Sequence, residues 1–84
     1  MTTGVQFNGS LGPNQSNKWF TYGWNAAQHV VWYVVPTSPQ SGNPQIDWSV
    51  AVERANATQC TYWITVKNLT GATVNFEARY AILN

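Results

Sequence analysis

Three segments that alternate apolar and polar residues follow one another between residues 45 and 82, and they constrain the fold more than any other feature. Their apolar positions are Ile46, Trp48, Val50 and Val52, then Tyr62, Ile64 and Val66, and finally Val74, Phe76, Ala78, Tyr80 and Ile82. A period of two residues places such side chains on one face of a β-strand. The sequence therefore predicts three strands, each with one buried face. Trp63 breaks the pattern, because it lies on the polar face.

The connections between these segments predict an antiparallel meander with a defined register. Residues 69–71 fit a three-residue hairpin loop with Gly71 in the left-handed conformation. The connection before it is short enough for neighbouring strands to pair, and it brings opposite charges together on the solvent face. The expected cross-strand pairs are Val66–Val74, Ile64–Phe76, Trp63–Glu77, Val50–Ile64 and Asp47–Lys67.

The first half of the chain predicts three more strands. One covers residues 5–11 and contains a bulge, with a hairpin at Asn8-Gly9 as the alternative. The next covers residues 18–24 and has aromatic residues on both faces: Phe20, Tyr22 and Trp24 on one, and Trp19 on the other. Residues 29–36 are apolar on both faces, which predicts a central strand covered by a second sheet and by a neighbouring subunit.

Six predicted strands with short connections and no helical periodicity indicate an all-β fold. We expect a small antiparallel β-sandwich of about six strands, with a flattened barrel as the alternative. A chain of 84 residues has room for one domain, which spans residues 1–84. Since strands with few charges invite pairing with another copy, a homo-oligomer is expected.

The composition argues against several classes of function. Only 8% of the residues are charged and the net charge is +1. The four basic residues lie in separate segments and form no stripe for phosphates, so no nucleic-acid partner is expected. One His and one Cys form no zinc site, and no cofactor motif is present. His29 is expected to be a hydrogen-bonded residue at a strand end, and Cys60 a partly buried residue at a strand start.

The sequence also lacks the features of an enzyme. No turn of the Gly-x-Ser-x-Gly type holds a nucleophile. Glu53 and Glu77 are expected to share a flat exposed face, where nothing would separate their pKa values as acid–base catalysis requires. We therefore expect a protein that is not an enzyme.

The N-terminus has neither the basic start nor the apolar core of a classical signal peptide. The longest apolar run, residues 30–35, is far shorter than the roughly 20 residues that cross a bilayer. These features predict a soluble protein without a membrane span, and they leave its location open.

The surplus of aromatic residues is the best functional signal in the sequence. The chain has five Trp, and the alternating pattern of their segments places Trp32 and Trp48 in the core. An exposed indole can lie against the C–H face of a sugar ring, while amides and carboxylates hold its hydroxyls. The sequence thus predicts a lectin-like module for a glycan, made multivalent by oligomerisation. The candidate ligand-binding residues are Trp63 with Glu77 and Arg79, Trp24 with Asn25 and Gln28, and Trp19.

The alternative is a structural or assembly protein without a small-molecule ligand. In that case the surplus aromatic side chains are buried between subunits, where Trp and Tyr contribute much of the binding energy.

Overall fold

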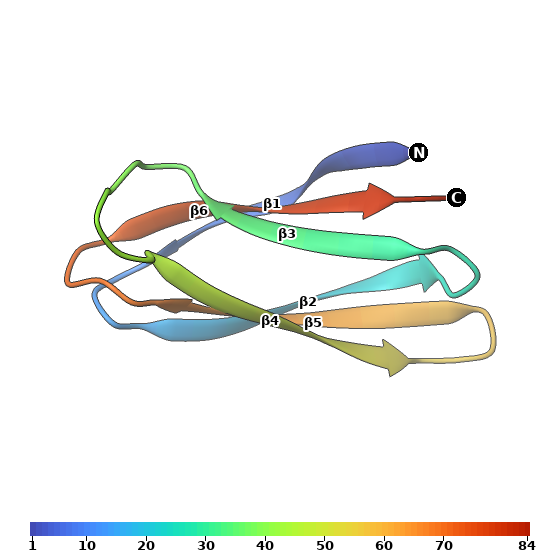
Figure 1. The fold of residues 1–84 in the computed structure, drawn as a ribbon. Helices are drawn as coiled ribbons and strands as arrows, with labels where there is room; N and C mark the ends of the chain where they lie inside the picture. The colour runs from blue at the N-terminus through green and yellow to red at the C-terminus, as the bar shows by residue number, and fades with distance from the viewer.

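The computed structural model describes residues 1–84 and contains six β-strands and no helix (Figure 1). The strands are β1 (Thr2–Leu11), β2 (Ser16–Asn25), β3 (Val30–Pro36), β4 (Ile46–Arg54), β5 (Gln59–Asn68) and β6 (Val74–Ile82). They form two three-stranded antiparallel sheets, in the orders β1-β6-β3 and β2-β5-β4, which lie face to face. The predicted all-β sandwich is confirmed, and the sheets do not close into a barrel.

The core lies between the two central strands, β5 and β6. Their inner faces carry the alternating apolar residues that the sequence predicts, and Ile64, Val66 and Phe76 are almost completely buried. Trp32 is buried and Trp48 packs against the same cluster, which confirms the placement of both indoles. Because one side chain in two faces inward, each central strand contributes a continuous apolar row to the core.

The register of β4 against β5 is as predicted, with Val50 opposite Ile64 and Asp47 opposite Lys67. The predicted β5–β6 hairpin, with Val66 opposite Val74, is wrong. β5 pairs with β2 and β4, whereas β6 pairs with β1 and β3. Residues 69–73 instead carry the chain from one sheet to the other, and Gly71 has no positive φ. Both strands have a mainly apolar inner face, with Asn68 at the end of β5 as the polar exception, and facing each other across the core buries both rows at once.

Asn68 stabilises this crossing from inside the protein. Its side chain is fully buried, and its Nδ2 donates to the carbonyl oxygens of Leu11, Gly12 and Ala72 at 3.1, 2.9 and 2.6 Å. Its Oδ1 accepts from the backbone N–H of Thr70 at 2.8 Å. One amide therefore joins the β1–β2 turn to the β5–β6 crossing and leaves none of these groups unpaired.

β3 was expected to be central, but it is an edge strand that pairs only with β6. Its inner face places Trp32 and Val34 in the core, while Val31 and Tyr33 on its outer face are 51% and 55% exposed. An apolar residue on both faces is what a covered strand requires. The outer face of β3 shows that the same pattern also occurs in a strand covered on one side only.

Two bulges shape the β1–β2 side of the sandwich. β1 has the predicted bulge, which lies between Val5 and Phe7. β2 has a second irregularity between Thr21 and Trp24, where Gly23 has a φ of 81°. Because a bulge shifts the alternation of side chains, Trp24 lies on the inner face rather than beside Phe20 as predicted.

Candidate functional site

Three aromatic rings lie in a row on the outer face of the β2-β5-β4 sheet, and we call them the aromatic row: Phe20, Tyr22 and Trp63. Phe20 is directly opposite Trp63, with ring centroids 5.1 Å apart, and its centroid is 6.3 Å from that of Tyr22. Each pair of rings is inclined by 30°. Phe20 and Tyr22 are 59% and 75% exposed, so both side chains are largely accessible to solvent.

Trp63 is held in place by a carboxylate. Its indole Nε1 donates a hydrogen bond to Oε1 of Glu53 on the neighbouring strand, at 2.9 Å. Ala51, opposite Trp63 on β4, adds only a methyl group beside the ring. This arrangement fixes the orientation of the half-buried indole next to Phe20.

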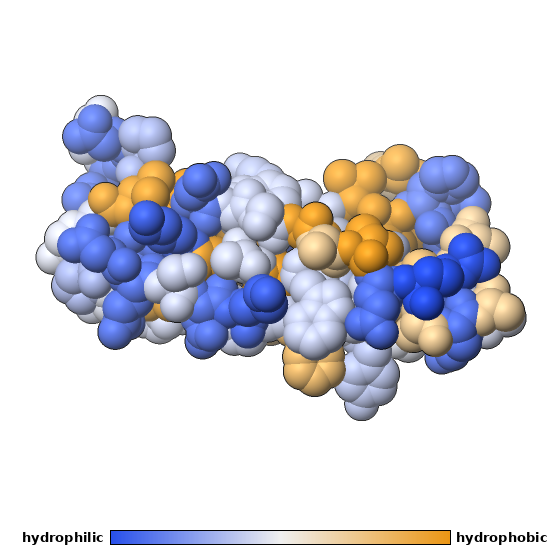
Figure 2. Space-filling model, turned by 90° about the horizontal axis from the view of Figure 1, so that it is seen from below, coloured by the Kyte–Doolittle hydropathy of each residue, from blue (hydrophilic) through white to orange (hydrophobic).

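The surroundings of the aromatic row are mainly polar. Figure 2 views the molecule from the side of this sheet and shows hydrophilic patches between shorter hydrophobic ones, with no single hydrophobic patch covering the face. The outward positions beside the row belong to Lys18, Ser49, Thr61 and Thr65. Rings separated by hydrogen-bonding groups suit a ligand that is itself amphipathic.

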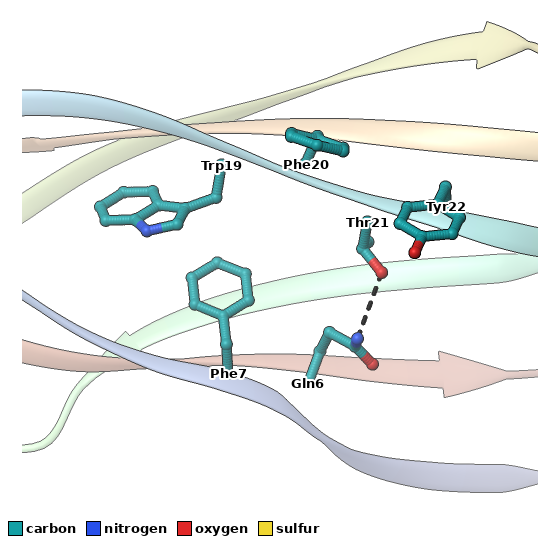
Figure 3. Close-up of a pocket in the computed structure, with 6 residues that line it drawn as sticks. All are labelled: Gln6, Phe7, Trp19, Phe20, Thr21 and Tyr22. Atoms are coloured by element: carbon teal, nitrogen blue, oxygen red, sulfur yellow. Dashed lines mark hydrogen bonds between the residues drawn. The ribbon is translucent and has the colours of Figure 1, made fainter.

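A cleft of about 430 Å³ adjoins the aromatic row, between β1 and β2 (Figure 3). This volume lies within the range of small-molecule sites, roughly 300–1,000 Å³. Its lining residues are Gln6, Phe7, Trp19, Phe20, Thr21 and Tyr22. None of these side chains carries a charge, so the cleft suits a neutral ligand.

The two sheets approach each other through polar contacts at this cleft. Nε2 of Gln6 donates to Oγ1 of Thr21 at 3.1 Å, across the gap between the strands (Figure 3). The same hydroxyl accepts from the indole Nε1 of Trp24 at 3.0 Å. Oε1 of Gln6 has no hydrogen-bond partner. The bulges therefore place an available amide oxygen beside a hydroxyl at the cleft.

The floor of the cleft is aromatic and rigid. The rings of Phe7 and Trp19 lie 5.5 Å apart, and the Trp19 ring is 5.3 Å from that of the buried Phe76. Trp19, one of the candidate residues from the sequence, thus contributes from the inner face of β2. Its role in binding stays a prediction.

The predicted grouping of Trp63 with Glu77 and Arg79 is wrong. Glu77 and Arg79 lie on the outer face of the β1-β6-β3 sheet, on the opposite side of the sandwich, because the chain crosses between sheets after β5. The two residues form an exposed ion pair with each other, with Nη2 of Arg79 3.0 Å from Oε1 of Glu77. Glu53 takes the position beside Trp63 that Glu77 was expected to hold.

The predicted exposed position of Trp24 is also wrong. Its ring packs on the inner face against Trp32, Tyr80 and Tyr62, with centroids 5.3, 5.2 and 6.0 Å away. The bulge at Gly23 turns it inward.

Asn25 is the last residue of β2, and Gln28 lies in the turn that follows. Oδ1 of Asn25 accepts from the N–H of Ala27 at 2.9 Å, and its carbonyl oxygen accepts from the N–H of Gln28 at 3.1 Å. These contacts shape the turn, and a ligand-binding role for either residue stays a prediction.

Sequence reasoning missed most of the cleft, namely Gln6, Phe7, Phe20, Thr21 and Tyr22. The alternation correctly places Phe20 and Tyr22 on one face of their strand, but the prediction of stacking extended to Trp residues alone. The best available signal was Gly23 within a strand pattern, because an isolated Gly there suggests a bulge.

His29 and Cys60 both lie at strand ends. His29 bonds to Asn84 through its backbone N–H and its ring Nδ1, at 2.7 and 2.9 Å, which confirms the expected hydrogen-bonded strand end. Cys60 is at the second position of β5, which confirms its expected place at a strand start, but it is buried in the core rather than partly buried. No group of three or more His, Cys, Asp or Glu side chains is placed to hold a metal ion.

No helix of the structure has the length and apolar character needed to cross a membrane. Comparison of the chain with protein-family models, with curated proteins and with solved structures gave no match.

Proposed function

We propose that the protein is a non-enzymatic carbohydrate-binding module, and that the glycan binds at the β1–β2 cleft and along the aromatic row. The observation that carries this proposal is the composition of the cleft. Four aromatic rings and two neutral hydrogen-bonding side chains surround a space of about 430 Å³. A sugar ring has the matching chemistry, because it presents an apolar C–H face and a rim of hydroxyl groups.

Different residues take different parts in this interaction. The exposed rings of Phe20 and Tyr22 supply flat surfaces for the C–H face of a pyranose. Oε1 of Gln6 accepts a hydrogen bond from a sugar hydroxyl. Trp63, oriented by Glu53, extends the row by one ring and would contact a second sugar unit. The absence of charge in the cleft favours neutral sugars over acidic ones.

A glycan array tests the proposal, with purified native protein as the first sample. We expect binding to neutral glycans and none to short acidic oligosaccharides without neutral units. If the native protein binds no glycan on the array, the proposal fails.

Matched tyrosine substitutions then locate the site. Tyr22→Ala removes a ring at the cleft, whereas Tyr33→Ala removes a similarly exposed ring from the other sheet. We expect Tyr22→Ala to weaken glycan binding by roughly tenfold, the effect of losing one aromatic contact of about 1.4 kcal/mol. Tyr33→Ala should keep the native affinity when a soluble, monovalent glycan is titrated, because that affinity does not depend on oligomerisation. Weaker binding by Tyr33→Ala and native binding by Tyr22→Ala would place the site on the β1-β6-β3 sheet.

The alternative function, an assembly protein whose aromatic residues lie between subunits, is supported by the exposed apolar residues of β3. Assembly and glycan binding do not exclude each other, because β3 and the cleft lie at opposite edges of the sandwich.

A further inference from the structure

The four edge strands of the sandwich differ in how they are protected from pairing with other chains. β1 and β2 carry bulges, which interrupt the regular edge. β4 carries the charged residues Asp47, Glu53 and Arg54. β3 has neither a bulge nor a charge, and its sequence is Val-Val-Trp-Tyr-Val-Val-Pro. Its one residue that disfavours pairing is Pro36, at the C-terminal end of the strand, so residues 30–35 form an edge without a recognised device against association.

The hydrogen bonds at the two ends of β3 show which of its backbone groups are free. The N–H of Thr37 donates to the backbone carbonyl oxygen of Asn75, and the N–H of Leu83 donates to that of His29, both at 2.9 Å. In an antiparallel pair, residues that bond to the partner strand alternate with residues that do not. The residues that bond to β6 are therefore Val31, Tyr33 and Val35, and those whose N–H and C=O point away from the sheet are Val30, Trp32 and Val34.

We propose that this edge pairs with β3 of a second copy of the chain, antiparallel and about a two-fold axis through Trp32. In this register Trp32 faces Trp32 of the second copy, and Val30 faces its Val34. Each of these pairs can exchange both backbone hydrogen bonds. The β1-β6-β3 sheet of one copy then joins the same sheet of the second copy to form one continuous sheet.

Neighbouring registers satisfy fewer backbone groups. A shift by two residues toward the C-terminus brings Pro36 to the pairing edge, where it has no N–H to donate. A shift in the other direction brings in Gln28, which belongs to the turn before β3. Pairing centred on Trp32 uses every free N–H and C=O of residues 30–34.

The same register also covers the exposed apolar side chains. On the outer face Val31 lies opposite Tyr33 of the second copy, and Tyr33 lies opposite its Val31. Such pairs of an aromatic and a β-branched residue stabilise antiparallel sheets. The two side chains are about half exposed in the single chain. Backbone and side-chain complementarity thus support the same partner, a second copy.

The other edges are less suited to pairing with themselves. If β4 paired with its own copy about Val50, Asp47 would face Glu53 of that copy, and like charges directly opposite are destabilising. The proposed β3 interface contains no charged residue. It leaves the β1–β2 cleft free, because β1 and β3 are opposite edges of one sheet.

Mass measurement by sedimentation tests the interface, independently of any glycan. We expect the native protein to have twice the single-chain mass of 9.4 kDa. Val31→Lys/Tyr33→Lys places like charges on both sides of the two-fold axis and should yield monomers, and Val31→Glu/Tyr33→Glu should do the same. An equal mixture of the two variants should restore the dimer, because opposite charges then face each other.

The matched control is Asn8→Lys/Ser10→Lys, which places the same charges at the same spacing on the outer face of β1. It should remain dimeric. A native protein that is monomeric at every concentration would overturn the proposal. So would β3 variants that keep the native dimer, or a mixture that stays monomeric.

Amide hydrogen exchange on the native protein provides a second test that needs no substitution. In the dimer the amides of Val30, Trp32 and Val34 should be as protected as those of Val31, Tyr33 and Val35, and their protection should fall on dilution. Fast exchange of the first set at high protein concentration would rule out this interface. Loss of glycan binding with an intact dimer would leave the interface standing and contradict the proposed function alone.

Discussion

Gly9 lies directly opposite Phe76 in the β1–β6 pairing, and a Cβ atom on Gly9 would overlap the Phe76 ring. That ring is 1% exposed and lies against Phe7 and Trp19, at centroid distances of 6.3 and 5.3 Å. It has no room to move aside. The missing side chain at residue 9 therefore allows Phe76 to lie over β1 and to support the floor of the cleft.

Gly9→Ala should lower the free energy of unfolding by about 1–3 kcal/mol, because it overpacks this contact. Urea unfolding followed by Trp fluorescence measures the change. The control is Gly71→Ala, since nothing lies within 4 Å of a Cβ at Gly71 and its φ is not positive. Equal stability of Gly9→Ala and the native protein would show that the Phe76 ring is not constrained.

Asn68→Asp should destabilise the protein by more than about 3 kcal/mol at neutral pH, because a carboxylate cannot donate to the three carbonyl oxygens that Asn68 contacts. Burial beside those oxygens should raise the pKa of the new carboxyl above its ordinary value of about 3.9. The variant should then recover stability as the pH falls through the raised pKa, since the protonated carboxyl can donate once.

The control for this substitution is Asn56→Asp. Oδ1 of the exposed Asn56 accepts from the N–H groups of Thr58 and Gln59, both at 2.9 Å, and a carboxylate can do the same. We expect a change within about 0.5 kcal/mol. Urea unfolding at several pH values compares the two variants, and similar profiles would contradict the assigned role of Asn68.

The free energy of unfolding at alkaline pH should depend on Tyr62. Burial raises the pKa of the Tyr62 phenol above its ordinary value of 10.0, and the charge of the Cys60 thiolate adds to this effect. Below pH 10.0 both the folded and the unfolded chain hold the phenol proton. Above it the unfolded chain releases the proton while the folded chain retains it, so stability decreases as the pH rises.

Tyr62→Phe removes this part of the pH dependence, and the free energy of unfolding should fall less steeply above pH 10.0 in the variant than in the native protein. Unfolding curves at a series of alkaline pH values measure both slopes. Identical slopes would show that the Tyr62 proton makes no difference between the two states.

Glu53 should affect ligand binding through the orientation of Trp63. Glu53→Ala removes the acceptor of the Trp63 indole N–H, so we expect glycan binding to weaken by a few-fold. Glu53→Gln keeps an acceptor oxygen and should bind as the native protein does. Titration of an array-identified glycan measures all three proteins. Equal affinities for the alanine and glutamine variants would show that the hydrogen bond has no part in binding.

The alternation of apolar residues was sufficient to predict six strands and the inner faces of β4, β5 and β6. It could not predict which strands are neighbours, because a period of two specifies the buried face of a strand and not the strand beside it. The β4–β5 register was an exception, since a short connection and the Asp47–Lys67 pair restricted the choices. For β5 and β6 a hairpin loop and a crossing between sheets are compatible with the same residues.

The candidate site was harder to predict than the fold. Of the predicted residues, Trp63 lies in the aromatic row and Trp19 lines the cleft. The bulge at Gly23 reversed the expected position of Trp24, and one extra residue in a strand is enough to do so. Gln6 and Thr21 come from strands of different sheets, so their contact depends on the packing of the sandwich.

The order of the strands also has a consequence for biosynthesis. β1 and β3 pair with β6, and β2 pairs with β5, so each of these strands must wait for a partner that the ribosome makes later. Only β4 and β5 are both adjacent in the chain and paired. While the strands are being translated, the nascent chain holds unpaired aromatic segments, which are the form of a polypeptide that chaperones bind and that aggregates most readily.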